Sequence, residues 1–207
     1  MEQAFYIRLE RLGKKFYQRW IFRDVEYDSL AHPRLAVIGR NGSGKSTLLR
    51  IIAGQMVPSE GRSLFYTGTR KVAADACYRY LSWSAPYLSL YEDLTLREHL
   101  DLHFRLRDCL LPRPADLIDL LALGDHADKR LRYYSSGMLQ RVKVGTALFT
   151  AAPLLLLDEP TSNMDEENAR RMIELIDTYR GDRVLVLASN LEREFAGFER
   201  RIVLGSG

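Results

Sequence analysis

One segment of the sequence has the residue types and the spacing that bind phosphate. Residues 39–46 read GRNGSGKS, after an apolar run and before a helix-like segment. Gly42 and Gly44 let the backbone curl so that amide N–H groups face an anion, Lys45 would reach the β- and γ-phosphates, and the Ser46 hydroxyl would ligate Mg²⁺. A glycine turn without a ligand is the alternative, and the flanking strand and helix disfavour it. The residues expected to contact the nucleotide are Gly39, Arg40, Asn41, Gly42, Ser43, Gly44, Lys45, Ser46 and Thr47.

Two adjacent carboxylates follow a second apolar run. Leu154–Glu159 reads LLLLDE, which predicts a buried strand whose carboxyl end carries both acids, the place where open α/β sheets bind ligands. We expect Asp158 to hold Mg²⁺ through its water shell and Glu159 to accept the proton of an attacking water. Pro160 then ends the strand.

A Ser-Ser-Gly turn lies between these two motifs. Residues 134–141 read YSSGMLQR and predict a turn that opens a helix, whose N-terminus could face an anion. By itself the segment is weak evidence, because a serine at a helix N-cap is more often a structural feature.

The elements that must position these motifs predict an α/β fold. Alternating apolar residues in the first thirty positions indicate antiparallel strands, and the continuously apolar Leu35–Ile38 indicates a strand buried on both faces. Thr95 and Glu98 form a capping box, and Pro114 opens a further helix. We expect one domain over residues 1–207: residues 1–74 and 151–207 form a phosphate-loop NTPase core with a mostly parallel sheet and an N-terminal antiparallel β part, and about 75–150 form an inserted helical subdomain.

Composition excludes several other classes of protein. The 207 residues carry 30 basic against 27 acidic side chains, a net charge of +3 that is too even for a nucleic-acid footprint. The longest apolar run is far shorter than the roughly 20 residues that cross a bilayer, and MEQAFYIRLE lacks the layout of a secretory signal, so we expect a cytoplasmic chain. The cysteines Cys77 and Cys109 are expected to be reduced thiols, and the histidines are expected to be packed or surface residues rather than ligands: His99, His103 and His126.

Taken together, GRNGSGKST, YSSGM, LLLLDEP and TSNMD, in this order, resemble the ATP-binding cassette family over essentially the whole chain. The resemblance implies ATP and Mg²⁺ as ligands and a head-to-tail dimer, with a second copy or a paired cassette. Each ATP would lie between the phosphate loop of one copy and the signature turn of the other. It implies the following residues for this interface: Ser135, Ser136, Gly137 and Met138 in the signature, and Ser162 and Asp165 in the turn that links the two sites. It also implies that Phe16 stacks on adenine, with ordinary sheet packing as the alternative.

The chain departs from the family pattern at three places. In the signature, Tyr134, Ser136 and Met138 replace the usual Leu, Gly and Gln, although the Ser135 hydroxyl remains. The glutamine expected to touch Mg²⁺ is absent, and the alignment leaves open which residue replaces it: Ser84, Ala85 or Pro86. The switch histidine is replaced by Ser189, which can donate a hydrogen bond but carries no positive charge.

These features favour an ATP-hydrolysing subunit that energises a separate integral membrane permease and lies on the inner face of the membrane through that partner. The chain resembles small export-type cassettes, including haem-export subunits, and YSSGM is similar to the signature of some polysaccharide-export cassettes. The absent glutamine and histidine predict slow turnover. Two alternatives remain: a soluble cassette ATPase, for example of iron–sulfur assembly, and a nucleotide-gated clamp that barely hydrolyses ATP.

Overall fold

The N-terminal strands form an antiparallel sheet, as their alternating residues predict, in a computed structural model that describes residues 4–205. Its strands are β1 (Phe5–Phe16), β2 (Arg19–Asp28), β4 (Glu60–Thr67) and β5 (Arg70–Val72), in the order β2-β1-β4-β5. The pairing of β1 with β2 shifts between Leu9 and Leu12. Both leucines are buried, although a regular strand would place side chains three residues apart on opposite faces of the sheet. A β-bulge explains this, because the extra residue returns the next apolar side chain to the core face.

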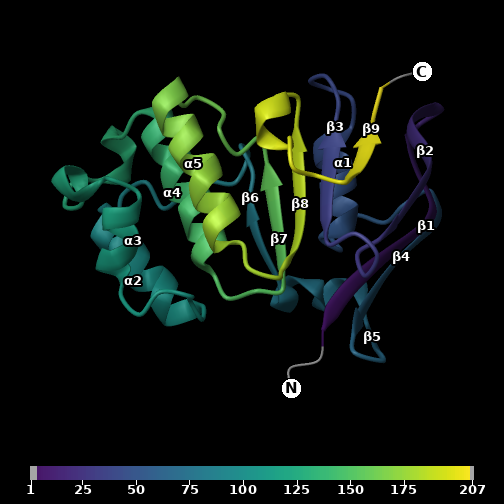
Figure 1. Ribbon diagram of the computed structural model, residues 1–207, viewed down its shortest axis with the longest axis horizontal. Helices are drawn as coiled ribbons and strands as arrows, with labels where there is room; N and C mark the ends of the chain where they lie inside the picture. The colour runs from purple at the N-terminus through teal and green to yellow at the C-terminus, as the bar shows by residue number, and fades with distance from the viewer. Residues whose placement is uncertain (1–3, 206–207) are drawn as a thin grey trace. The chain divides into compact units, whose positions relative to one another are not determined.

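The second sheet carries the strands that precede the chemical motifs. It consists of β6 (Leu81–Ser84), β7 (Leu154–Asp158), β8 (Val184–Ser189), β3 (Arg34–Ile38) and β9 (Arg200–Val203), in the order β6-β7-β8-β3-β9. β3 pairs in parallel with β8 and β9, and β7 pairs in parallel with β8 (Figure 1). Every residue of β7 and β8 is buried, as expected for parallel strands covered on both faces. The predicted α/β fold with a mostly parallel sheet is confirmed.

Helix α1 (Lys45–Ile52) begins immediately after the glycine-rich loop and packs against β7 and β8. Its buried apolar side chains, Leu48, Leu49, Ile51 and Ile52, recur at helical spacing and hold it on the sheet. The packing therefore fixes the direction in which the N-terminus of α1 points.

The remaining α-helices are α2 (Leu96–Leu106), α3 (Pro114–Leu120), α4 (Ser136–Phe149) and α5 (Glu166–Tyr179), joined in part by short 3₁₀ turns at Gly124–His126 and Leu131–Tyr133. Further 3₁₀ segments cover Ala74–Tyr80 and Glu192–Glu194. The predicted capping box is present: the Thr95 side chain accepts from the Glu98 N–H, and the Glu98 carboxylate accepts from the Thr95 N–H. Within residues 4–205, none of the helices combines the length and apolar character needed to cross a bilayer.

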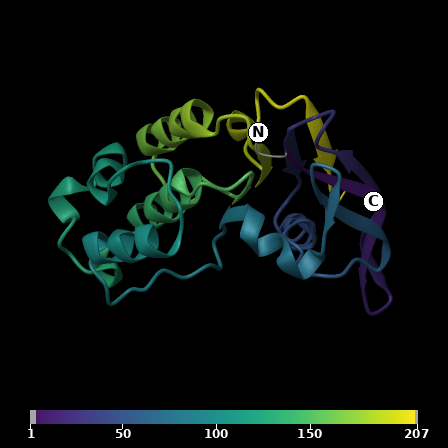
Figure 2. The ribbon, with the colours of Figure 1, turned by 90° about the horizontal axis from the view of Figure 1, so that it is seen from below.

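Contacts divide the chain into two compact units. The first contains the residues through Leu81, then Ala152–Asp158 and the residues from Asp182 on; the second contains Ser82–Ala151 and Glu159–Gly181. Figure 2 shows the helices of the second unit gathered together. The sequence predicts residues 151–207 as part of the sheet core; by contacts, α5 packs on α4, and residues Glu159–Gly181 are grouped with the helices.

Candidate nucleotide-binding site

The glycine-rich loop joins β3 to α1 in a conformation that requires its glycines. Gly42 and Gly44 have positive φ angles of 81° and 102°, which residues with a Cβ rarely adopt. A Cβ on Gly44 would also clash with Cγ2 of Ile21. Ser43 N–H donates to the Arg40 carbonyl at 3.1 Å, which closes the turn. The loop therefore has the tight curl that a phosphate cradle needs.

Lys45 lies inside this curl rather than in solvent. Its side chain is 5% exposed, and its ammonium Nζ donates to the carbonyl of Gly39 at 2.9 Å and to that of Arg40 at 3.3 Å. A buried ammonium at the first turn of α1 adds its charge to the positive end of the helix dipole. The electrostatics of the loop thus favour an anion.

Ser46 and Asp158 are brought together from positions 112 residues apart. The Ser46 hydroxyl donates to Oδ2 of Asp158 at 2.6 Å, and Asp158, the last residue of β7, is 1% exposed. A hydroxyl and a carboxylate at hydrogen-bond distance are the hard oxygen donors that Mg²⁺ takes from proteins. These residues fit the predicted magnesium ligands.

Ser189 ends β8 at the same edge of the parallel sheet. It is paired in register with Ile38, the residue before the loop, and its neighbour Ala188 is paired with Asp158. The side chain is 1% exposed, and its Oγ accepts from the Leu191 N–H at 2.9 Å. The carboxyl ends of β3, β7 and β8 thus place the loop, Asp158 and Ser189 beside one another.

Glu159 has an unusual backbone conformation. Its φ is 48°, a left-handed value that costs a non-glycine residue of order 1–3 kcal/mol. Its carbonyl accepts from the Ser162 N–H at 3.1 Å and from Nε2 of Gln140 at 3.1 Å. The sequence pattern assigns no role to Gln140, although this residue lies within the YSSGMLQR segment.

The signature residues form the N-terminus of α4. Ser135 is the N-cap, and its hydroxyl accepts from the Met138 N–H at 3.2 Å, while Ser135 and Ser136 are exposed. Tyr134, one of the departures from the family pattern, is buried; its hydroxyl donates to the His126 carbonyl at 2.7 Å, and burial raises its pKa to about 12. A phenol in the usual leucine position therefore has both packing and a hydrogen bond.

The residues expected in the linking turn follow β7. Asp165 is the N-cap of α5, and its carboxylate accepts from the backbone N–H of Asn168 at 2.8 Å, which lowers the pKa of the carboxyl. The Ser162 hydroxyl is buried with no hydrogen-bond partner among the described residues.

Phe16 lies at the end of β1 and is 42% exposed, so its ring is not part of the sheet core. The Lys14 ammonium lies 5.2 Å from its ring centre.

Among the three candidates for the missing glutamine, Ser84 and Ala85 are buried and Pro86 is exposed. Only Ser84 offers a side-chain oxygen, and that hydroxyl has no hydrogen-bond partner among the described residues.

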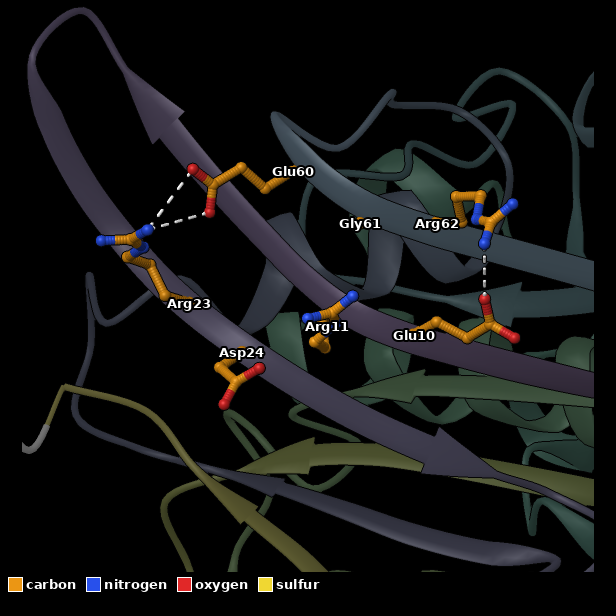
Figure 3. A pocket seen from close by; sticks show the side chains of 7 residues that line it. All are labelled: Glu10, Arg11, Arg23, Asp24, Glu60, Gly61 and Arg62. Atoms are coloured by element: carbon orange, nitrogen blue, oxygen red, sulfur yellow. Dashed lines mark hydrogen bonds and ion pairs between the residues drawn. The ribbon is translucent and has the colours of Figure 1, made fainter.

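A separate pocket of about 650 Å³ lies on the antiparallel sheet (Figure 3). Its lining residues come from β1, β2 and β4: Glu10, Arg11, Arg23, Asp24, Glu60, Gly61 and Arg62. Ion pairs cross it between Arg23 and Glu60 at 3.1 Å and between Arg62 and Glu10 at 3.3 Å. Its three acidic and three basic side chains balance, so the pocket has no excess positive charge to attract a polyanion.

The histidines of α2 are packed side chains. His103 lies with Nε2 2.9 Å from the Thr150 hydroxyl, and burial, followed by nearby His99 and Arg107, lowers its pKa to about 4. His99 is 7% exposed, and burial lowers its pKa as well. Within the described residues, no group of three or more His, Cys, Asp or Glu side chains could hold a metal ion.

Comparison with known proteins gives concordant results. A family model described as "ABC transporter" matches residues 22–162. The chain is 28% identical to the mouse ATP-binding cassette sub-family A member 17 over 97% of its own length, but it spans only 12% of that relative. It is 32% identical to the sulfate/thiosulfate import ATP-binding protein CysA of Thermosynechococcus vestitus, covering 77% of this chain and 48% of that protein. A solved structure of a putative ABC transporter ATP-binding protein from Pyrococcus furiosus superposes with a TM-score of 0.79 and 18% identity, over 96% of this chain and 97% of that one, which shows a shared fold.

Proposed function

Because the chain belongs to the ABC transporter family, we propose that it binds and hydrolyses MgATP and so energises a separate membrane permease. The observation that carries this proposal is the contact between Ser46, beside the phosphate loop, and Asp158, at the end of β7. The buried Lys45 ammonium and the Ser46–Asp158 pair combine a cation, a hydroxyl and a carboxylate in one unit of the fold. Such a set suits a triphosphate with its divalent cation better than any uncharged ligand.

Each of these residues has a distinct task in the proposed reaction. The loop amides and Lys45 hold the phosphates, because phosphoryl transfer depends chiefly on positioning and on neutralising charge. Ser46 and Asp158 would hold Mg²⁺, which supplies charge neutralisation at the phosphate oxygens when bound. Glu159 orients the attacking water and accepts its proton, and Ser189 donates a hydrogen bond toward the γ-phosphate.

The active form that we propose is a head-to-tail dimer with a second copy or a paired cassette. The N-terminus of α4, with the exposed Ser135 and Ser136 and the half-buried Gly137 and Met138, would complete the ATP site of the partner copy. Phe16 would stack on the adenine ring, for which its 42% exposure leaves room. In this arrangement the sheet unit binds ATP and the helical unit offers the signature.

The permease is proposed to be a separate integral membrane chain, which would hold this subunit at the cytoplasmic face. We propose export as the direction, on the similarity of YSSGM to the signature of export-type cassettes. One relative carries "import" in its name, so cargo transport in vesicles has to decide the direction. Uptake into inside-out vesicles that contain both subunits supports export, and release from them opposes it.

The hydrolysis proposal is tested by steady-state phosphate release from MgATP. We expect slow release by the wild-type chain and a fall of about 100-fold or more in Glu159→Gln, because an amide cannot accept the proton. Glu166→Gln is the matched control, since this exposed acid lies on the first turn of α5. Equal rates for wild type and Glu159→Gln would contradict the role of Glu159.

The permease proposal is tested by purifying tagged Glu159→Gln with MgATP from detergent-solubilised membranes of its own organism. A polytopic membrane protein in stoichiometric amount supports the transporter function. Soluble partners alone, from a preparation that holds the ATP-bound dimer, would support an assembly ATPase instead.

A nucleotide-gated clamp is the second candidate, and the chemistry of Ser189 favours it. The hydroxyl lacks the positive charge of the usual histidine, and no glutamine lies between Gln55 and Gln140. Dimerisation on MgATP with no turnover, even beside the permease, would establish the clamp.

A further inference from the structure

Gln140 is a buried polar side chain that holds two consecutive backbone carbonyls. It lies on the second turn of α4 and is 4% exposed. Its amide nitrogen donates to the Glu159 carbonyl at 3.1 Å and to the Pro160 carbonyl at 3.3 Å. A primary amide nitrogen carries two hydrogens, and Gln140 donates both of them to the backbone that follows β7.

The backbone whose carbonyls Gln140 holds, at Glu159 and Pro160, lies outside the helices and strands, so regular secondary structure does not fix its shape. Glu159 has a φ of 48°, a strained value for a residue with a Cβ. Pro160 has no N–H to donate, so this residue adds no backbone donor of its own to the turn. The Gln140 bonds and the Ser162 N–H, which donates to the Glu159 carbonyl at 3.1 Å, oppose relaxation of that backbone.

A second contact comes from the same face of α4. A Cβ on Gly137 would lie 2.6 Å from the Asn163 carbonyl oxygen, so the backbones approach as closely as a glycine permits. Gly137 and Gln140 are three residues apart and share a face of the helix. The helix that Ser135 caps therefore touches the segment after β7 at two points, one of which is the backbone of Glu159.

We propose that Gln140 is a positioning residue for Glu159: its amide fixes the backbone from which the Glu159 carboxylate is presented, and it makes that presentation depend on the placement of α4. The inference rests on the proposed function, in which Glu159 accepts the proton of the attacking water. Gln140 acts through the backbone of Glu159. A change in the position of the signature turn would then change the position of the Glu159 carboxylate.

The first test replaces the amide by an apolar side chain of similar size, Gln140→Leu. We expect kcat for ATP hydrolysis to fall about 10- to 100-fold, as misplacement of a reacting group by about 1 Å does, while KM for ATP stays within about twofold. Thr146→Val is the matched control: it lies on the same helix and loses one side-chain bond to a carbonyl, but that carbonyl belongs to Val142 of α4 itself, at 2.7 Å, and not to the segment after β7. Its kcat should stay within twofold of wild type.

The decisive measurement is a double-mutant cycle with Glu159→Gln. If Gln140 works through Glu159, Gln140→Leu has no further effect on the residual rate in the Glu159→Gln background. Independent, multiplying losses in kcat, or a loss confined to KM or to thermal stability, would overturn the positioning role. If Glu159→Gln itself leaves the rate unchanged, the proposed function fails, and this inference fails with it.

A further variant covers the case in which Gln140→Leu does not fold. In Gln140→Glu the introduced carboxyl can donate one hydrogen bond only when it is protonated. We expect the ratio of the variant's kcat to the wild-type kcat to rise as the pH is lowered from about 8 to about 6. Folding is monitored by circular dichroism at each pH. A constant ratio across this range contradicts the inference.

Discussion

Replacing Ser46 by alanine should weaken both the fold and its response to Mg²⁺. The Ser46 hydroxyl donates to Oδ2 of Asp158 at 2.6 Å, and the carboxylate is 1% exposed, so water cannot readily take the place of the lost donor. A hydrogen bond to a charged group contributes about 1.5–3 kcal/mol. The free energy of unfolding in the absence of nucleotide and Mg²⁺ should therefore fall by about that amount.

The assay is urea denaturation followed by circular dichroism. With a slope of about 2–3 kcal/mol per molar urea, the expected loss moves the midpoint down by roughly 0.5–1.5 M. Ser46→Thr is the control, because threonine keeps the hydroxyl at the same position. Its midpoint should stay near that of the wild-type chain.

The same variant tests the metal site. Loss of a hydroxyl ligand should raise the Mg²⁺ concentration needed for half-maximal ATP hydrolysis by at least about 10-fold in Ser46→Ala, and Ser46→Thr should retain the wild-type requirement. An unchanged midpoint together with an unchanged Mg²⁺ requirement in Ser46→Ala would refute both the energetic reasoning and the ligand assignment.

Two further predictions concern the helical unit. Gly137→Ala should lower the midpoint of unfolding by an amount equivalent to about 1–3 kcal/mol, because its Cβ would meet the Asn163 carbonyl at 2.6 Å, whereas Gly124→Ala, with no atom within 4 Å of the new Cβ, should change it little. Stability should fall as the pH drops from about 6.5 toward 4, because the pKa of His103 is lowered to about 4 in the folded chain, so the unfolded chain binds the proton first. His103→Gln should flatten this part of the pH profile in urea denaturation, and an unaltered slope would count against the assignment.

Features that depend on neighbours along the chain were predictable from the sequence. The glycine-rich loop forms because Gly42 and Gly44 permit positive φ angles, a property of those residues themselves. The capping box of Thr95 and Glu98 is equally local, since its two hydrogen bonds join residues three apart. The apolar run of β7 predicted a buried strand because its hydrophobic residues are continuous.

Sequence periodicity leaves the choice of neighbouring strands open, because any apolar strand can pair with any other. The parallel register of β3 with β8 sets Ser189 opposite Ile38, and it is the tertiary fold that brings Ser46 to Asp158. A hydrogen bond between residues 112 apart leaves no periodic trace in the sequence.

By itself the sequence determined which residues could do phosphate chemistry and which secondary structures flank them, since both follow from residue type and short-range spacing. The tertiary structure alone decided that Glu159 has a left-handed φ and that Gln140 holds its carbonyl. The physical reason is that a strained backbone persists only where packing and hydrogen bonds from distant residues over-determine it. A buried glutamine finds its acceptors only once α4 has packed against the segment that follows β7.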